Sequence, residues 1–168
     1  MAITTQLARI TPGRLSECRR SVAELDGLCS FELVPASEHL DLDWADDALI
    51  RVCERAGVGN VPALRRATGG DDEVNPAYRD HPYSVWEQPK ALEPSDVLTL
   101  AAALCDIDMG HVLSVLPSDP RKLKAAILGA LADFIGDPRP YITTHFNALR
   151  DFYAVAAENH LAVVVWRD

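Results

Sequence analysis

The 168-residue sequence has no hydrophobic run long enough to cross a membrane. Its most apolar segments, Val97–Leu104 and Leu161–Trp166, are far shorter than the roughly 20 residues that span a bilayer. The first 15 residues also lack the apolar stretch of a secretory signal peptide. We therefore expect a cytoplasmic protein that does not associate with membranes.

Sequence motifs that mark common catalytic and cofactor sites are absent too. The chain contains no Gly-x-x-x-x-Gly-Lys-Ser/Thr phosphate loop and no Gly-x-Gly-x-x-Gly dinucleotide fingerprint. It also has no Gly-x-Ser-x-Gly turn for a serine nucleophile. The sequence consequently identifies no catalytic residue and implies no cofactor, which argues against an enzyme without excluding one.

Basic residues are scarce relative to acidic ones. The 16 Lys and Arg residues stand against 25 Asp and Glu residues, which gives a formal net charge of −9. Because affinity for nucleic acid rests on Lys and Arg, this balance argues against a nucleic-acid partner. An acidic protein of this kind is instead suited to attract a basic partner.

The four cysteines lack the Cys-x-x-Cys spacing of metal and redox sites. Three of them, Cys18, Cys53 and Cys105, lie among apolar residues at helical spacing. We predict that these three are buried free thiols, as in a reducing compartment, rather than metal ligands or disulfides. Cys29 completes the set of four.

The order of strand and helix patterns predicts a single α+β domain over residues 1–168. Strands are expected at the N-terminus (Ile3–Ile10), near Trp86 (Tyr83–Gln88) and at the C-terminus (Leu161–Trp166). Consecutive valines in the last segment predict a central strand that is covered on both faces. Five or six helices should cover this small sheet.

Residues 57–89 form a long excursion with four glycines and four prolines. The expected regular structure is one short helix at Pro62–Ala67 and the strand near Trp86, whose side chain we assign to the core rather than to the surface. Long segments of this kind often carry function. The excursion contains the candidate binding residues Tyr78, His81, Tyr83 and Trp86.

A second group of candidate residues precedes a strongly amphipathic helix at residues 45–56. His39, Asp41 and Asp43 alternate along the chain, so that in an extended segment they would share one face. They could hold a hard divalent cation. We favour the alternative, in which Asp41 and Asp43 cap the helix and no metal binds.

Four segments spread over nearly the whole chain resemble the YfbM-like family of bacterial proteins, a domain of unknown function. The first two are Leu40–Asp43, which opens an amphipathic helix, and Pro62–Gly70, which is similar to a Pro-Leu-x-x-Ala-x-x-Gly-Gly segment. The others are Tyr83–Val97, which ends in Leu-Glu-Pro-Ser-Asp-Val, and the closing helix and strand from Phe146 to Trp166. The resemblance implies a cytoplasmic α+β domain, and it implies no activity or catalytic residue.

Two functional hypotheses follow. The first is a non-catalytic binding protein, regulator- or immunity-like, with a protein partner. The second is a small-molecule or metal-dependent enzyme. Its pocket would lie between the 57–89 segment and the helix starting near Asp43, with His39, Asp41, Asp43 and His81 as polar groups. A closed pocket that holds several of these groups would favour the enzyme, whereas exposed aromatic residues would favour the binding protein.

Overall fold

A computed structural model describes residues 3–81, 85–127, 131 and 134–168 of the chain. It confirms the α+β class. Five strands form one antiparallel sheet in the order β2-β1-β5-β4-β3. Their bounds are β1 Thr5–Ile10, β2 His39–Asp41, β3 Asp72–Glu73, β4 Glu87–Leu92 and β5 Ala162–Arg167.

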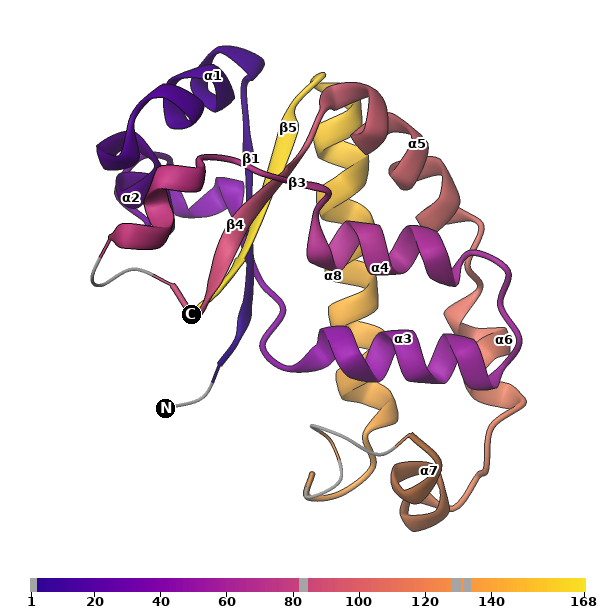
Figure 1. Cartoon of the computed structure of the whole chain (residues 1–168). Helices are drawn as coiled ribbons and strands as arrows, with labels where there is room; N and C mark the ends of the chain where they lie inside the picture. The colour runs from indigo at the N-terminus through magenta and orange to yellow at the C-terminus, as the bar shows by residue number, and fades with distance from the viewer. Residues whose placement is uncertain (1–2, 82–84, 128–130, 132–133) are drawn as a thin grey trace.

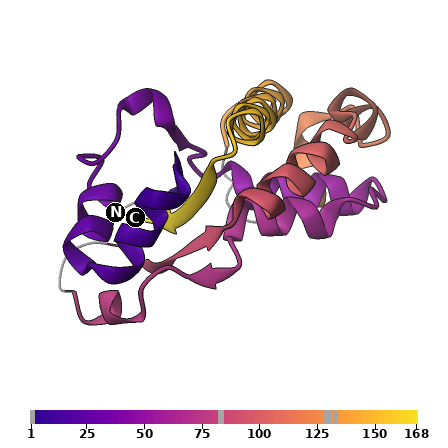
Figure 2. The ribbon, with the colours of Figure 1, turned by 90° about the horizontal axis from the view of Figure 1, so that it is seen from above.

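Helices cover both faces of this sheet, as Figures 1 and 2 show from two directions. One face carries α1 (Pro12–Arg20), α2 (Val22–Cys29) and the 3-10 turn η2 (Pro76–Asp80), and the short turn η1 (Ala36–Glu38) precedes β2. The other face carries α3 (Ala45–Arg55), α4 (Val61–Gly69), α5 (Pro94–Cys105), α6 (Met109–Ser114), α7 (Pro120–Ile127) and α8 (Arg139–Glu158).

Strand β5 lies at the centre of the sheet and contributes to a hydrophobic core on each face. Val163 and Val165 face the larger core, together with Phe146 and Tyr153 of α8. On the opposite face Trp166 is only 1 % exposed. The prediction of a central strand that is covered on both sides is thus confirmed.

The segment 57–89 is more regular than predicted. It contains α4, which includes the expected short helix, and also β3 and η2. The described residues contain eight α-helices rather than five or six. The sequence missed α6, because this helix is only six residues long and therefore shows little periodicity.

Trp86 is the clearest error of the sequence prediction. Strand β4 begins after this residue, at Glu87, and the Trp86 side chain is 71 % exposed rather than in the core. The backbone N–H of Trp86 donates to the Arg167 carbonyl at 2.6 Å, which fixes the residue where β4 meets β5 but leaves its indole outside. Tyr83, predicted for the same strand, lies outside the described residues.

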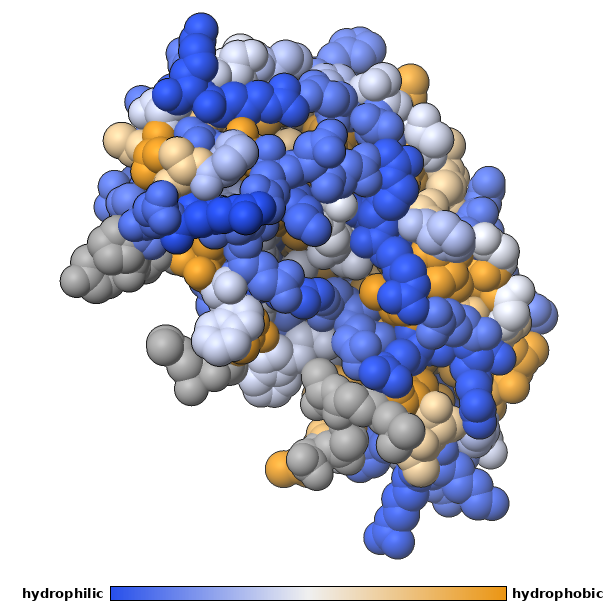
Figure 3. All heavy atoms as spheres, viewed as in Figure 1, coloured by the Kyte–Doolittle hydropathy of each residue, from blue (hydrophilic) through white to orange (hydrophobic). Residues whose placement is uncertain are grey.

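The surface seen in Figure 3 is mostly hydrophilic, with small separate apolar spots. No helix among the described residues combines the length and the apolarity needed to span a membrane. Some large hydrophobic side chains are nevertheless exposed. Trp86 and Leu98 are two of them.

The cysteine prediction holds for Cys18 and Cys53 but is wrong for Cys105. Cys18, Cys29 and Cys53 are buried free thiols, whereas Cys105 is the last residue of α5 and is exposed. Burial raises the pKa of Cys18 and that of Cys53 to about 11, and raises the pKa of Cys29 further. The helical period placed Cys105 near the apolar stripe but could not show that the helix end extends beyond the core.

This arrangement predicts the reactivity of the four thiols. In the folded protein at pH 8, a disulfide reagent such as DTNB should label one thiol rapidly and three slowly, because the buried thiols are both shielded and protonated. Cys105→Ser should remove the fast phase and leave the slow one. Rapid labelling of a second thiol without denaturant would contradict the burial described above.

Candidate functional site

The turn that follows β2 and the start of β4 lie at the same end of the sheet. The strands are antiparallel and follow the order β2-β1-β5-β4. One end of the sheet is therefore formed by the end of β2, the start of β1, the end of β5 and the start of β4. With strands about 4.8 Å apart, the turn after β2 and the start of β4 are roughly 15 Å apart. Two segments that are some forty residues apart in the sequence therefore border one surface.

We call this region the sheet-end surface. It combines two exposed indoles with four carboxylates and one guanidinium. Trp86 is 71 % exposed and Trp44 is 41 % exposed. The residues that define the surface are Asp41, Asp43, Trp44, Asp46, Trp86, Glu87 and Arg167.

A tight turn fixes the acidic residues after β2. The Asp43 backbone N–H donates to Asp41 Oδ1 at 2.7 Å, and Asp43 has a φ of +52°. Asp is one of the residues that tolerate this left-handed conformation. The Thr5 N–H donates to the Asp43 carbonyl at 3.1 Å, which ties the turn to the start of β1.

Helix α8 supports the same turn through Tyr141. The Tyr141 hydroxyl donates to Asp43 Oδ2 at 3.0 Å and accepts from the Trp44 backbone N–H at 3.3 Å. Burial, followed by the hydrogen bond to the Asp43 carboxylate and its charge, raises the pKa of Tyr141. The phenol therefore stays protonated and holds both Asp43 and the start of α3 in place.

The prediction that Asp41 and Asp43 cap the helix is wrong. The residue at the N-cap of α3 is Trp44, whose own side chain forms no capping hydrogen bond. The carboxylate of Asp41 caps the preceding turn instead, and that of Asp43 binds Tyr141. Within the described residues, neither carboxylate forms an ion pair with a basic side chain.

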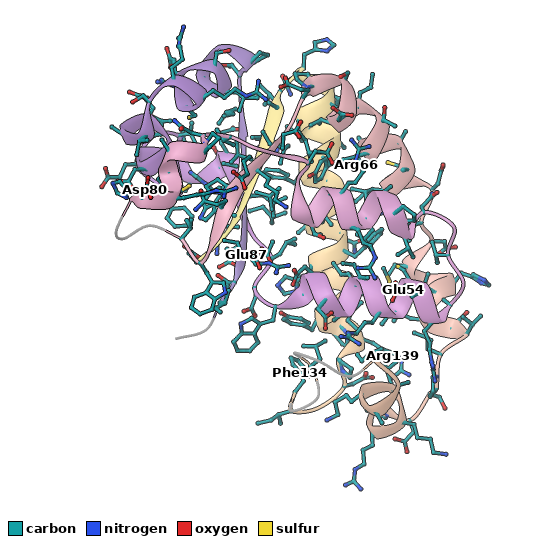
Figure 4. All side chains as sticks on the ribbon, in the orientation of Figure 1. Glu54, Arg66, Asp80, Glu87, Phe134 and Arg139 are labelled. Atoms are coloured by element: carbon teal, nitrogen blue, oxygen red, sulfur yellow. The ribbon has the colours of Figure 1, made fainter. Side chains whose placement is uncertain are left out.

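Arg167 occupies the middle of the sheet-end surface. Its guanidinium bridges Asp46 of α3, at 2.7 Å, and Glu87 of β4, at 3.0 Å. Figure 4 shows Glu87 at the start of β4, on the side that faces α3. Because one guanidinium compensates two of the four carboxylates, the surface keeps a negative charge near Trp44.

The remaining predicted site residues lie on the other face of the sheet. The Tyr78 hydroxyl donates to Asp26 Oδ1 at 3.2 Å, and the His81 ring stacks on Tyr78 at 5.4 Å. His81 Nδ1 is 3.5 Å from the same Asp26 oxygen. His39 packs near the Trp166 ring. Tyr78, His81 and His39 are therefore separated from the sheet-end surface.

This separation removes the arrangement that the enzyme hypothesis requires. His39, Asp41, Asp43 and His81 do not surround a common pocket, and within the described residues no three His, Cys, Asp or Glu side chains are placed to hold a metal ion. The two aspartates are near each other, but His39 and His81 are directed into packing contacts.

An open cavity of about 550 Å³ lies at the opposite end of the sheet, where β1 leads into α1. Its two arginines are already compensated: Arg9 pairs with Glu38 at 2.6 Å, and Arg14 pairs with Glu17 at 2.8 Å. The cavity thus offers no unpaired charge to a ligand. The sheet-end surface is the better candidate site.

Sequence reasoning missed Trp44, Asp46, Glu87, Arg167 and Tyr141. One signal was present: Arg167 is a lone charge that ends an otherwise apolar strand, which indicates a residue leaving the core. Nothing in the sequence pairs that arginine with Asp46 and Glu87, because both partners depend on the order of the strands.

No protein-family model matches the chain, and no curated protein does. Among solved structures, the chain is similar to the crystal structure of YfbM from Escherichia coli, which is described as a protein of unknown function. The sequence identity is 13 %, the TM-score is 0.64, and the match covers 98 % of this chain and 99 % of that one. The chain therefore has a YfbM-like fold over essentially its full length.

Proposed function

We propose that this chain is a cytoplasmic, non-catalytic binding protein that docks a basic segment of a partner protein on its sheet-end surface. The observation that carries the proposal is the placement of two exposed tryptophans on either side of carboxylates that are only partly compensated. Large aromatic side chains dominate the binding energy of many protein interfaces. We therefore expect Trp86 and Trp44 to contribute most of the binding energy.

The chemistry of the surface favours cationic side chains in the partner. A guanidinium or ammonium group can lie over an indole face, which contributes about 0.5–2 kcal/mol. The same cation can pair with Asp41 or Asp43, which have no basic partner among the described residues. The net charge of −9 would also speed the encounter with a basic protein.

Hydrogen bonds and an ion pair hold this surface in place, which suits it to binding a partner. Tyr141, the Thr5 backbone and the Arg167 bridge hold the turn and the two strand ends before any partner arrives. A preformed surface loses less conformational entropy on association. None of its groups is arranged as a nucleophile with an adjacent base.

The test is affinity capture from a lysate of the host with tagged wild-type protein and the Trp44→Ala/Trp86→Ala double variant. The wild type should retain a specific basic protein that the double variant loses. Leu98→Ala is the matched control, because Leu98 is 59 % exposed on α5 and its loss should not affect capture. Equal recovery with the wild type and the double variant would show that the tryptophans do not form the binding surface.

A further inference from the structure

We propose that His39 is a pH-sensitive switch. The neutral ring holds strand β2 and the preceding segment, residues 30–38, against the sheet, and protonation of the ring releases them. The inference concerns the buried start of the edge strand β2 rather than the sheet-end surface, and it goes beyond the proposed function. It begins from the surroundings of the imidazole.

The His39 ring forms a cluster of three mutually contacting rings with Phe31 and Trp166, whose own centroids are 5.7 Å apart. Its centroid is 5.0 Å from that of Phe31, at an interplanar angle of 60°, and 6.1 Å from that of Trp166, at 87°. Both ring nitrogens are shielded from solvent, and neither has a hydrogen-bond partner of good geometry among the described residues. A neutral imidazole fits this site, whereas an imidazolium would place a charge against two aromatic rings and away from water.

The charged groups around His39 do not outweigh the preference of this site for the neutral imidazole. Burial lowers the pKa of His39 from its ordinary value of 6.5, although the Val34 backbone and the charge of Glu38 favour the protonated ring. Glu38 is already paired with Arg9. From β1, the residue opposite His39 is Ala8, which carries no charge.

Two further carboxyl groups lie near this face of the sheet. Asp41 is two residues along β2 from His39, and Asp168 is two residues beyond Trp166. The pKa of Asp168 is raised, chiefly by burial. A raised carboxyl pKa makes the closed state bind protons more tightly, so that Asp168 opposes release on acidification rather than causing it.

Protonation of His39 has the opposite effect on the equilibrium between the closed and released states. Because its pKa is lowered in the closed state, the released state binds the proton more tightly, and a fall in pH below about 6.5 favours release. Strand β2 can be released without disrupting the rest of the sheet, since it is three residues long and pairs with β1 on one side only. Phe31 is 46 % exposed and has a φ of +63°, so the segment leading to β2 is already at the surface.

The experiment follows the fluorescence of Trp166 in a Trp44→Phe/Trp86→Phe background, where Trp166 is the remaining tryptophan. Between pH 8 and pH 5, its emission should shift to longer wavelength, and its quenching by acrylamide should increase several-fold, with a midpoint below 6.5. His39→Phe keeps an aromatic ring in place but cannot titrate, so it should abolish the transition. His39→Gln serves the same purpose if the Phe variant does not fold.

Two controls assign the transition to His39. His160→Asn removes an exposed histidine whose positive φ asparagine tolerates, and it should leave the transition intact. Asp168→Asn should also leave it intact. Constant shielding of Trp166 from pH 8 to pH 5, a transition that persists in both His39 variants, or one that disappears in Asp168→Asn would each overturn the proposal.

Discussion

Deletion of residues 161–168 is expected to abolish cooperative folding. The deletion removes β5, which pairs with β1 on one side and with β4 on the other, and leaves both neighbours with unpaired backbone edges. The five residues Ala162–Trp166 are all buried. Each large side chain among them contributes about 1.5–3 kcal/mol, so that their sum approaches the 5–15 kcal/mol stability of a typical domain.

The measurement is a thermal melt followed by near-UV circular dichroism, together with the solubility of the truncated chain. A matched control carries Asp71→Ala, Asp72→Ala and Glu73→Ala, at and beside β3, which forms one edge of the sheet. Its lost ion pairs, Arg66–Asp71 and Arg79–Glu73, are exposed and contribute little, so this variant should stay folded. A cooperative melt of the truncated chain near the full-length value would contradict the central position of β5.

Phe146→Ala should cause the second largest effect, a loss of about 3–5 kcal/mol in the free energy of unfolding. The Phe146 side chain is 1 % exposed and belongs to the larger core, on the part of α8 that lies beside the junction of α5 and α6. In a chain of this size, the loss corresponds to a decrease in Tm of roughly 6–20 °C.

Leu98→Ala provides the comparison, because it also truncates a large hydrophobic side chain but at a site that is 59 % exposed. Its Tm should change by a few degrees at most. Equal destabilisation by the two substitutions, measured by urea unfolding, would mean that α8 does not bury Phe146 in the larger core as described.

The sequence predicted the elements that bury a continuous or periodic apolar surface. The valines of β5 and the periodic apolar residues of α8 predict that both elements are buried, because their apolar side chains must be covered. β2, His39–Asp41, and β3, Asp72–Glu73, were missed because they are short polar edge strands without such a pattern. β4 contains a proline and begins with polar residues, and its strand conformation depends on pairing with β5.

The candidate site was predictable only in part. The sequence singled out Asp41, Asp43 and Trp86, all of which lie on the sheet-end surface. It could not show that they share a surface, since their proximity follows from the strand order. It also assigned Trp86 to the core, because alternation of apolar residues does not reveal which side of a short segment is covered.

The most direct test of the sheet-end surface uses a fluorescently labelled oligoarginine peptide as the basic probe, titrated at low salt and followed by anisotropy. Asp41→Asn/Asp43→Asn removes two charges but retains the acceptor for the turn and a residue that tolerates positive φ. Asp151→Asn/Glu158→Gln removes the same charge from exposed positions on α8 and serves as the control.

The binding account predicts that Asp41→Asn/Asp43→Asn and Trp44→Ala/Trp86→Ala each weaken binding of the probe by at least about tenfold, equivalent to about 1.4 kcal/mol. The control should bind nearly as tightly as the wild type. Equal losses in the control and in Asp41→Asn/Asp43→Asn, with no effect of the tryptophan substitutions, would show that only net charge attracts the peptide and would contradict a docking role for the sheet-end surface.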